Sequence, residues 1–373
     1  MKRDTPKSVV IVVIIDPLTG GHHDIYKRIY SSILNAMGFK VRIAPSIEEE
    51  ETTNPLKLWF YAREFLEKIS IEEGKKPDLV MFLWIDSYLS PYLPAFLIDR
   101  IFPYDWFGLY FHPRHLRMRP KFNLFLNFLN PDLLFQCEHC KAIGVLDSGV
   151  AKRLQNKIWN KPVIPFPVVI DTDVENTDTK LITDIRRRSK GRKVLGILGS
   201  LEKRKGILTA IKLAEKYKKE NLFFVFAGEL AKETFSGEEQ KIIFKVIEEN
   251  PENCYFYPKK IDEDNLFNSI ISICDLIFLE YINFPHSSNL LVKAAFFKKP
   301  VIVSRGYYMD EIVRKYGMGK SVEQGNVDDS FRAIKSLLYE KDFNPGGFAK
   351  FYKDNSISNL RMGLAKMIDV AKK

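Results

Sequence analysis

The sequence contains few cysteines and no long apolar run, and each absence excludes a class of protein. Four cysteines in 373 residues are too few for a disulfide framework and are typical of a reducing cytoplasm. The longest candidate for a membrane-spanning helix is residues 122–135, and polar residues interrupt it. Its uninterrupted apolar runs are much shorter than the roughly 20 residues that such a helix needs. Residues 1–16 imitate a signal peptide, but their apolar part is short and lacks a small-residue cleavage site. We therefore expect a cytoplasmic protein in which this segment forms a buried strand.

Patterns that would hold a metal or a cofactor are also sparse. Cys137, His139 and Cys140 are three potential zinc ligands, but no second ligand pair lies at a matching distance, which favours ordinary thiols. Residues 171–173, Asp-Thr-Asp, have the spacing of a carboxylate clamp for a divalent cation but fall between the two predicted domains. Gly20 and Gly21 do not match a dinucleotide fingerprint. We expect neither a bound metal nor a cofactor.

The charge favours an anionic partner. The formal net charge is +10, which suits nucleic acid, anionic lipid or a phosphorylated ligand. Residues 106–131 contain no acidic side chain, and within them residues 114–129 alternate arginine and lysine with leucine and phenylalanine. This pattern predicts either a surface that rests on an anionic membrane or a core helix with a basic lead-in. Residues 186–193 include six basic residues and no aromatic ones, which favours a solvated linker over a nucleic-acid site.

Strand and helix patterns alternate along the first half of the chain. Continuous apolar runs predict buried strands, and runs with helical periodicity predict helices between them. The predicted strands are residues 9–15, 40–45, 79–85, 107–111 and 142–146, and the predicted helices are residues 25–37, a stretch ending near 68, and 150–156. This alternation predicts an α/β fold with a mainly parallel sheet covered by helices on both faces.

A second series of the same kind follows a region rich in proline and then in polar residues. Its predicted strands are residues 194–198, 223–226, 254–257, 276–279 and 300–303, and its predicted helices are residues 207–217, 241–249, 262–272, a short helix after 287, 310–316, 328–340 and 356–372. We expect a Rossmann-like domain over residues 1–173, a linker over 174–193 and a second Rossmann-like domain over 194–350. We expect the two domains to face each other across a cleft. Residues 351–373 should form a final helix that packs back on the first domain.

Residues 287–289, Ser-Ser-Asn, open the short helix that follows the strand 276–279. Serine is a favoured N-cap because its oxygen accepts a hydrogen bond from the free amides of the first helical turn. Those amides and the helix dipole also suit an anion such as a diphosphate. Ligands of parallel sheets bind beyond the carboxyl ends of the strands, where Gly20, Gly21, His112 and the loop 199–206 also fall. The sequence therefore predicts a nucleotide site.

Two segments resemble the GT-B fold glycosyltransferases, in particular the retaining family 4, glycosyl transferases group 1. They are GSLEKRKGILTAI, residues 199–211, and the run from Ser272 to Val313. The resemblance covers nearly the whole chain and is specific in the second half. It implies that a strand-end glycine and a basic loop hold the diphosphate of a nucleotide-sugar donor. Lys205 matches the family's lysine, whereas Ser200 stands in place of an arginine, so the second positive charge comes from Lys203 or Arg204 or is absent.

The family's motif of two glutamates separated by seven residues is replaced in this sequence. Alignment on the Ala-Ala and Pro-Val pairs at 294–295 and 300–301 puts Pro285 and Lys293 at the glutamate positions. In the family, the first glutamate contacts the donor sugar and the second holds the ribose. A lysine cannot accept hydrogen bonds from ribose hydroxyls, so the resemblance implies altered nucleotide recognition. The candidates for nucleoside or sugar contacts are Gly228, Tyr257, His286 and Lys293, and Glu280 and His286 lie close enough in sequence to substitute in part.

The first half adds two weaker matches to the family. Gly20 and Gly21 resemble its glycine loop, which faces the diphosphate and the acceptor, and His112 resembles a histidine that lies beside the transferred sugar. The resemblance thus implies catalytic roles for His112 and Lys205, and transfer with retention and without a metal. The residues expected to contact the diphosphate are Gly20, Gly21, Ser200, Lys203, Arg204, Lys205, Ser287, Ser288 and Asn289.

We expect a glycosyltransferase that moves a sugar from a UDP or GDP donor to a glycan or lipid-linked acceptor, with a peripheral contact at the inner face of the membrane through residues 114–129. The alternative is a non-catalytic glycosyltransferase-like subunit that binds a glycan or protein partner, which the replaced glutamates favour. Nucleic-acid binding rests on charge alone and is not expected.

Overall fold

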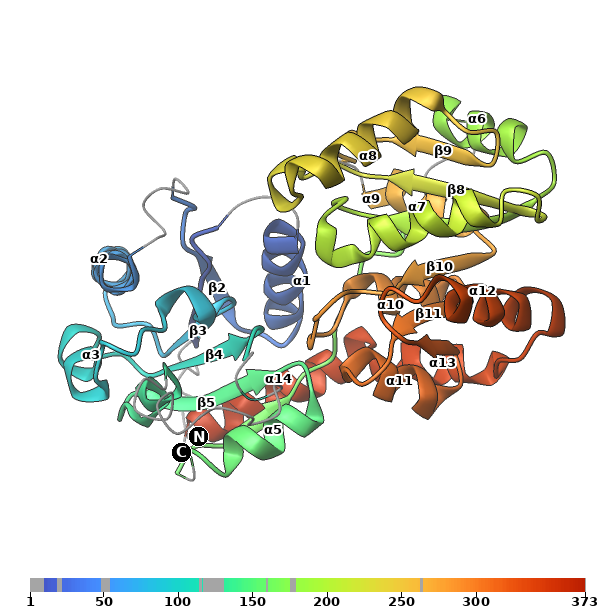
Figure 1. Cartoon of the computed structure of the whole chain (residues 1–373). Helices are drawn as coiled ribbons and strands as arrows, with labels where there is room; N and C mark the ends of the chain where they lie inside the picture. Colours follow the sequence, from blue (N-terminus) through green and yellow to red (C-terminus); the bar gives the residue numbers. More distant parts are fainter. Residues whose placement is uncertain are drawn as a thin grey trace. The chain divides into compact units, whose positions relative to one another are not determined.

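The computed structural model describes residues 10–18, 22–47, 54–113, 116, 131–158, 160–174, 179–261 and 264–372. The chain divides into two compact units, the first comprising residues 1–167 and 357–373 and the second residues 168–356 (Figure 1). Each unit is built on a six-stranded sheet in which all paired strands are parallel. The predicted α/β class with two Rossmann-like domains is therefore confirmed.

The first unit has the strand order β2-β1-β3-β4-β5-β6. Its strands are β1 (Ile11–Ile15), β2 (Lys40–Ile43), β3 (Leu79–Phe82), β4 (Trp106–Tyr110), β5 (Cys140–Val145) and β6 (Val163–Pro165). Its helices are α1 (His22–Ala36), α2 (Pro55–Glu73), α3 (Ala95–Ile101), α5 (Ser148–Gln155) and α14 (Ile357–Ala371), with the 3-10 turns η2 (Ile85–Tyr88) and η4 (Pro131–Gln136). Every residue of β1, β3 and β4 is buried, which explains their continuous apolar runs.

Local sequence sets the ends of the helices in this unit. The side chain of Asn54 accepts hydrogen bonds from the amides of the first turn of α2, and Gly74 ends that helix with a φ of 67°. The side chain of Asp147 caps α5 in the same way. The final helix, α14, packs against β4, β5 and β6, so the predicted return of the last helix to the first domain is confirmed.

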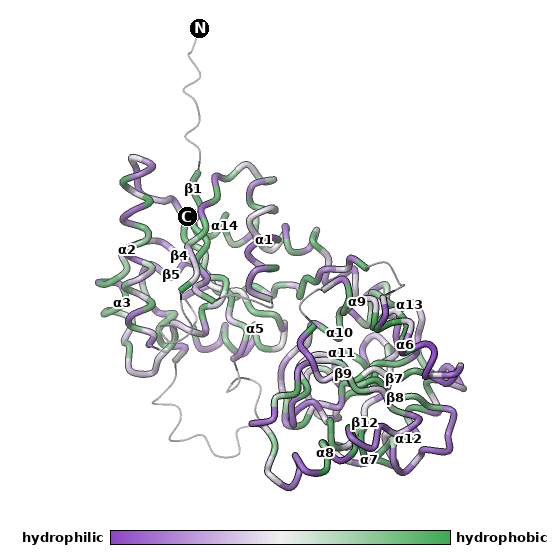
Figure 2. Tube along the Cα trace, turned by 90° about the horizontal axis from the view of Figure 1, so that it is seen from above, coloured by the Kyte–Doolittle hydropathy of each residue, from purple (hydrophilic) through white to green (hydrophobic). Residues whose placement is uncertain are grey.

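The second unit has the strand order β12-β11-β10-β7-β8-β9. Its strands are β7 (Lys193–Leu198), β8 (Leu222–Ala227), β9 (Cys254–Tyr257), β10 (Leu276–Leu279), β11 (Val301–Ser304) and β12 (Gly319–Val322). Its helices are α6 (Lys180–Ser189), α7 (Ile207–Lys216), α8 (Gly237–Glu249), α9 (Asp264–Ile273), α10 (Asn289–Phe296), α11 (Tyr308–Tyr316), α12 (Val327–Lys335) and α13 (Pro345–Asp354), with the 3-10 turns η5 (Lys203–Lys205) and η6 (Lys232–Thr234) and the π-helical turn η7 (Ser336–Glu340). The central strands β7 and β8 are apolar, whereas polar residues dominate α12 (Figure 2).

Part of the predicted linker, residues 174–193, is helical. Within it, α6 carries the first three arginines of the basic run 186–193. Two arginines of this run, one in α6 and one after it, bind the turn that joins α8 to β9. Arg188 donates hydrogen bonds to the Asn250 side chain and to the carbonyls of Pro251 and Cys254, and Arg192 donates to the carbonyl of Glu252. These arginines are structural, in contrast to the solvated surface that their sequence predicts.

Among the described residues, no helix combines the length and the apolar character needed to span a bilayer.

Candidate functional site

The second unit gathers a strand-end glycine and a basic loop at the carboxyl edge of its sheet. Gly199 and Ser200 follow β7 directly, and the 3-10 turn η5 (Lys203–Lys205) comes next. Gly206 then opens α7 with a φ of 72°, a conformation that glycine adopts without strain. A Cβ at this position would lie 2.4 Å from the carbonyl oxygen of Glu280 at the end of β10. The glycine therefore allows the basic loop to pack directly against the end of the neighbouring strand.

Two of the three loop cations are neutralised by nearby carboxylates. Lys203 Nζ lies 2.7 Å from Glu239 at the start of α8, and the Arg204 guanidinium pairs with Glu202. Arg204 also lies over the ring of Phe284, 4.9 Å from its centroid, which ties the basic loop to the loop between β10 and α10. These contacts fix both side chains and reduce the charge that they offer to a ligand.

Lys205 is the cation that this site leaves without a counter-ion. Its side chain is half-buried, and it makes no hydrogen bond or ion pair with any described residue. Its Nζ lies 2.9 Å from the position that a Cβ on Gly199 would occupy, and the ring of Phe267 lies beside the same glycine. Burial lowers the pKa of Lys205 from 10.5 to about 8, with Arg204 adding to the effect and Glu202 opposing it. Such a site is poised to accept an anion, because an anion would compensate the lost hydration of the ammonium group.

The ends of the next strands lie close to this loop. Gly228, at the end of β8, has a φ of 141°, and a Cβ there would lie 2.2 Å from the carbonyl oxygen of Gly199. Its amide donates to the carbonyl of Tyr257, which ends β9. Gly228, Tyr257 and Gly199 therefore lie together at one edge of the sheet.

Helix α10 begins at Asn289 with Ser288 as its N-cap, but the predicted capping hydrogen bond is absent. The Ser288 hydroxyl is hydrogen-bonded to Tyr281 instead. Burial raises the pKa of the Tyr281 phenol, and the hydrogen bond to Ser288 opposes this effect. The prediction that Ser288 caps the helix with its side chain was therefore wrong. Because α10 follows β10, its first turn begins at the same carboxyl edge of the sheet as the basic loop.

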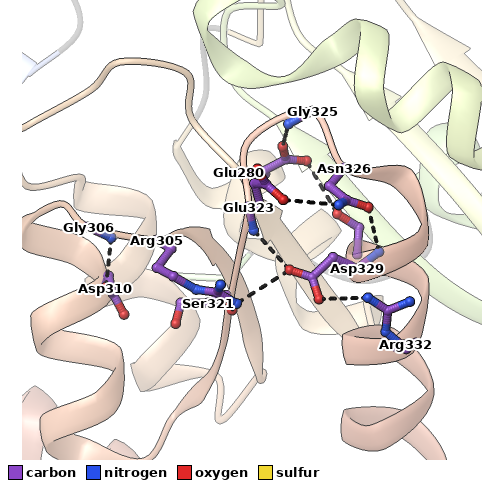
Figure 3. Close-up of polar contacts among 11 residues, drawn as sticks. Glu280, Arg305, Gly306, Asp310, Ser321, Glu323, Gly325, Asn326, Asp329 and Arg332 are labelled. Carbon is purple, nitrogen blue, oxygen red and sulfur yellow. Dashed lines mark hydrogen bonds and ion pairs between the residues drawn. The ribbon is translucent and has the colours of Figure 1, made fainter.

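Glu280 is a fully buried carboxyl group at the end of β10. It accepts a hydrogen bond from the amide of Gly325, and the Ser330 hydroxyl lies 3.5 Å from its second oxygen. Burial raises the pKa of Glu280 from 4.5 to about 7, and Asp329 adds to the effect while the two hydrogen bonds oppose it. The sequence suggested Glu280 as a substitute for a missing glutamate. Its contacts are instead with the loop between β12 and α12 and with α12 itself (Figure 3).

The polar groups around Glu280 bind mainly one another. Asp329 accepts from the amide of Glu323 at 2.9 Å and pairs with Arg305 and Arg332, and Asn326 caps α12. Figure 3 shows these side chains converging where β11 and β12 end. A shallow pocket of about 440 Å³ lined by Arg305, Glu323 and Gln324 borders this network.

In the first unit, His112 follows β4 and lies close to a neighbouring strand end. Its amide and that of Phe111 donate to the two carboxylate oxygens of Asp86 at 2.7 and 2.9 Å. Its ring lies 5.2 Å from that of Trp84, and its side chain is 41% exposed. His112 is therefore accessible, and Asp86 fixes its backbone.

A second histidine reaches the same tryptophan. His23, in the first turn of α1, lies with its ring 4.7 Å from Trp84 and is bound to the buried Asp16 at the end of β1. Sequence reasoning missed His23, Asp16, Trp84 and Asp86. A usable signal was present, since Asp16 directly follows a buried strand. Gly20 and Gly21 lie outside the described residues.

The proposed membrane segment, residues 114–129, lies outside the described residues except for Leu116, which is buried in the core of the first unit. Cys137 and Cys140 are buried, and His139 binds Asp105 at 2.9 Å. Burial raises the pKa of the Cys137 thiol to about 12. No cluster of potential metal ligands is present in the described part of the chain.

Residues 178–345 match the family model described as "Glycosyl transferases group 1", a span that lies within the second unit. The match covers most of the second unit. A comparison with curated protein sequences finds no match.

Solved structures similar to the whole chain share this architecture at low identity. A glycosyltransferase from Rickettsia africae ESF-5 is 15% identical, with 98% of this chain and 99% of that chain covered and a TM-score of 0.70. An α,α-trehalose 6-phosphate synthase from Burkholderia multivorans is 13% identical, with 98% and 97% covered and a TM-score of 0.67. HepE from Anabaena in complex with UDP-glucose is 12% identical, with 96% and 99% covered and a TM-score of 0.63. The fold of this chain is therefore the GT-B fold.

Within the residues that match this family model, Lys293 and His286 are both buried. Lys293 Nζ donates to the Asn268 side chain at 2.8 Å and lies 5.3 Å from the ring centroid of Phe267. Asn268 in turn donates to the carbonyls of Asp171 and Asp173. Lys293 is thus part of a polar network that holds the start of the second unit. The His286 ring packs edge-on against Phe284, which places it next to the ring that Arg204 covers.

Proposed function

We propose that this protein is a glycosyltransferase that moves a sugar from a nucleoside diphosphate donor to a glycan or lipid-linked acceptor. The observation that carries the proposal is the half-buried ammonium group of Lys205, which lacks a counter-ion among the described residues and lies at the carboxyl edge of the second sheet. Departure of a nucleoside diphosphate builds negative charge on the phosphate, and a preorganised cation in a poorly hydrated site stabilises that charge. The N-terminus of α10, where the Ser288 side chain makes no capping hydrogen bond, begins at the same edge, and a helix N-terminus favours an anion.

The type of donor and the course of the reaction rest on similarity. HepE was solved with UDP-glucose, which supports a UDP-sugar as the first donor to test. Retention of configuration and independence from a metal are carried by the resemblance to family 4. The roles proposed for His112 beside the sugar, and for Gly20 and Gly21 at the diphosphate, rest on the same resemblance.

Nucleotide titration tests the proposal directly. Isothermal titration with UDP, GDP and ADP should reveal binding of at least one nucleotide, and Lys205→Met should weaken that binding at least tenfold. Lys203→Met is the matched control, because the charge of Lys203 is already paired with Glu239, and it should change affinity less than threefold. Absence of binding by all three nucleotides would refute the proposal.

The second candidate function is that of a non-catalytic subunit with this fold. It is favoured by the presence of Lys293 at the position where the resemblance expects a ribose-binding glutamate. Its ammonium group is committed to Asn268 and cannot accept hydrogen bonds from ribose hydroxyls. Hydrolysis of UDP-, GDP- and ADP-sugars separates the two candidates. Turnover of any donor supports the enzyme, whereas nucleotide binding without turnover in the presence of glycan and lipid-linked acceptors supports the non-catalytic subunit.

We also propose that the protein binds the inner face of the membrane through residues 114–129. The support is the interleaving of basic and large apolar residues in this segment. Flotation with vesicles of phosphatidylcholine alone or with added phosphatidylglycerol measures the effect of lipid charge. Binding only to the anionic vesicles, and its loss when Arg117, Arg119 and Lys121 are replaced by Gln, supports the proposal. Equal behaviour with both vesicles contradicts it.

A further inference from the structure

The carboxyl group of Glu280 is buried at the end of β10 without a positively charged partner. Glu280 is completely buried, and one of its carboxyl oxygens accepts a hydrogen bond from the amide of Gly325. The Ser330 hydroxyl lies 3.5 Å from the other oxygen. No lysine, arginine or histidine of the described residues forms an ion pair or a hydrogen bond with this group. A buried carboxylate without a cation is costly, whereas the protonated group is satisfied by hydrogen bonds alone.

The charged side chains on the elements around Glu280 also favour its neutral form. Asp329, in the first turn of α12, adds a negative charge that raises the pKa of Glu280. Asp329 is paired with Arg305, which follows β11, and with Arg332 on α12, and the side chains of these arginines are 61% and 69% exposed. Glu323, in the loop between β12 and α12, is also exposed. Because water and salt screen exposed charges, the two arginines do little to stabilise a carboxylate at Glu280.

The basic loop packs on the backbone of Glu280. A Cβ on Gly206 would lie 2.4 Å from the Glu280 carbonyl oxygen, and the Ile282 amide donates to the Arg204 carbonyl at 2.6 Å. Lys205 Nζ lies beside Gly199, at the end of β7. Other charged groups of this loop and of α11 and α12 form pairs of their own: Arg204 with Glu202, Lys203 with Glu239, Asp310 with Arg314, and Asp328 with Lys216. The protonation of Glu280 is therefore governed by its burial, by α12 and by the loop that precedes α12.

The loop of residues 323–326 is tied to the end of β10 by the hydrogen bond from Gly325 to Glu280 (Figure 3). Gly325 is exposed, and a Cβ added there would meet no atom within 4 Å, so the outer side of the loop is open to solvent. The amide of Asn283 also donates to the Gln324 side chain at 3.1 Å, in an exposed position. A small movement of this loop away from β10 therefore lets water reach the carboxyl group.

The position of the loop determines how tightly Glu280 holds its proton. The two hydrogen bonds favour the carboxylate, but burial outweighs them and raises the pKa of Glu280 from 4.5 to about 7. When the loop is open, the carboxyl group is hydrated and its pKa returns toward that of an ordinary glutamate. The closed loop thus binds the proton more tightly than the open loop. By linkage, the proton favours the closed loop.

We propose that Glu280 is a proton-dependent switch for the loop 323–326. The protonated carboxyl group holds the loop against the end of β10. Loss of the proton to solvent leaves a buried carboxylate without a cation, and the loop opens so that water hydrates it. The pocket of about 440 Å³ lined by Arg305, Glu323 and Gln324 borders this loop, so protonation also determines the shape of that pocket.

The first test is hydrogen–deuterium exchange of peptides that contain Gly325, measured by mass spectrometry at pH 5 and pH 8. After division by the exchange rate of an unstructured peptide at the same pH, the exchange rate should rise by about tenfold or more between the two pH values. A peptide from the buried strand β8 should show no such rise, which separates opening of the loop from unfolding of the unit. An equal rise in both peptides, or none in either, would overturn the proposal.

Two matched variants identify the group that titrates. Glu280→Gln keeps an uncharged side chain that can accept from Gly325 and should abolish the rise. Glu323→Gln removes an exposed carboxylate from the same loop and should leave the rise unchanged. A rise that persists in Glu280→Gln, or that disappears in Glu323→Gln, would contradict the role of Glu280.

The second test follows the proton itself. Carbon-13 NMR of glutamate-labelled protein, with Glu280→Gln to assign the signal, should show the Glu280 carboxyl group titrating near pH 7. Titration near pH 4.5, the value of an ordinary glutamate, would overturn the proposal. Neither test needs a nucleotide, so their outcome is separate from that of the proposed function.

Discussion

Replacement of Lys205 by methionine should stabilise the ligand-free protein and weaken nucleotide binding at the same time. Burial lowers the pKa of Lys205 from 10.5 to about 8. Keeping the side chain protonated in the folded state therefore lowers the free energy of unfolding. A pKa difference of this size corresponds to about 3 kcal/mol at neutral pH. Methionine is of similar length and uncharged, so Lys205→Met should recover most of this energy. For a unit of this size, the expected rise in Tm is about 5–10 °C.

The dependence on pH gives this prediction an internal control. The unfolded chain keeps the Lys205 proton up to pH 10.5, whereas the folded chain keeps it only to about pH 8. Wild-type stability should therefore rise between these pH values, and the advantage of Lys205→Met should shrink above pH 10. The assay is thermal unfolding at pH 7, 9 and 10.5, with Lys203→Met as control.

Nucleotide binding should show the opposite effect. An anion beside Lys205 raises its pKa again, so UDP binding at pH 8 should take up protons, measured by calorimetry in buffers of different ionisation enthalpy. This uptake should be absent in Lys205→Met. Equal Tm values and equal UDP affinities for wild type and Lys205→Met would refute the reasoning, because they would show that the ammonium is hydrated and away from the ligand.

Two further substitutions test the interior of the second unit. Burial raises the pKa of Glu280 to about 7 from 4.5, so the folded chain holds a proton that the unfolded chain releases, and this group lowers stability as pH rises from 4.5 to 7. In Glu280→Gln, the loss of stability between pH 5 and pH 8 should be smaller than in wild type by about 2–3 kcal/mol. Denaturant unfolding at the two pH values measures this difference. The same loss in both proteins would contradict the prediction. Arg188→Ala should lower the free energy of unfolding by about 2–3 kcal/mol because three acceptors lose a charged donor. Arg187→Ala, which removes an exposed ion pair, should cost under about 1 kcal/mol, and equal losses in both variants would contradict a structural role for Arg188.

The sequence predicts the buried strands well because parallel strands covered on both faces need continuous apolar runs. The two strands that it missed, β6 and β12, are at the edges of their sheets. β6 ends on Pro165. An edge strand tolerates a proline because the strand has a hydrogen-bonded neighbour on one side only, so the missing N–H need not break a ladder. β12 has the sequence Gly-Lys-Ser-Val with one buried residue, so no apolar run marks it. The helix α6 was missed because its basic residues mask an amphipathic pattern.

The basic loop was predictable because its residues are adjacent in sequence. The site in the first unit was not, since it depends on contacts between separate strand ends. The apolar run 79–85 predicts one strand to Ile85, but β3 ends at Phe82 and η2 begins at Ile85. Trp84 and Asp86 are thereby released from the strand and lie where the sheet ends. The pairing of His23 with Asp16 likewise appears only when β1 and α1 are brought together.

The central claim, that the carboxyl edge of the second sheet binds a nucleoside diphosphate, is tested most directly by a crystal structure of the protein grown with UDP. We expect the diphosphate within hydrogen-bond distance of Lys205 Nζ and of the first-turn amides of α10. A diphosphate bound elsewhere, or no UDP at saturating concentration, would contradict the claim.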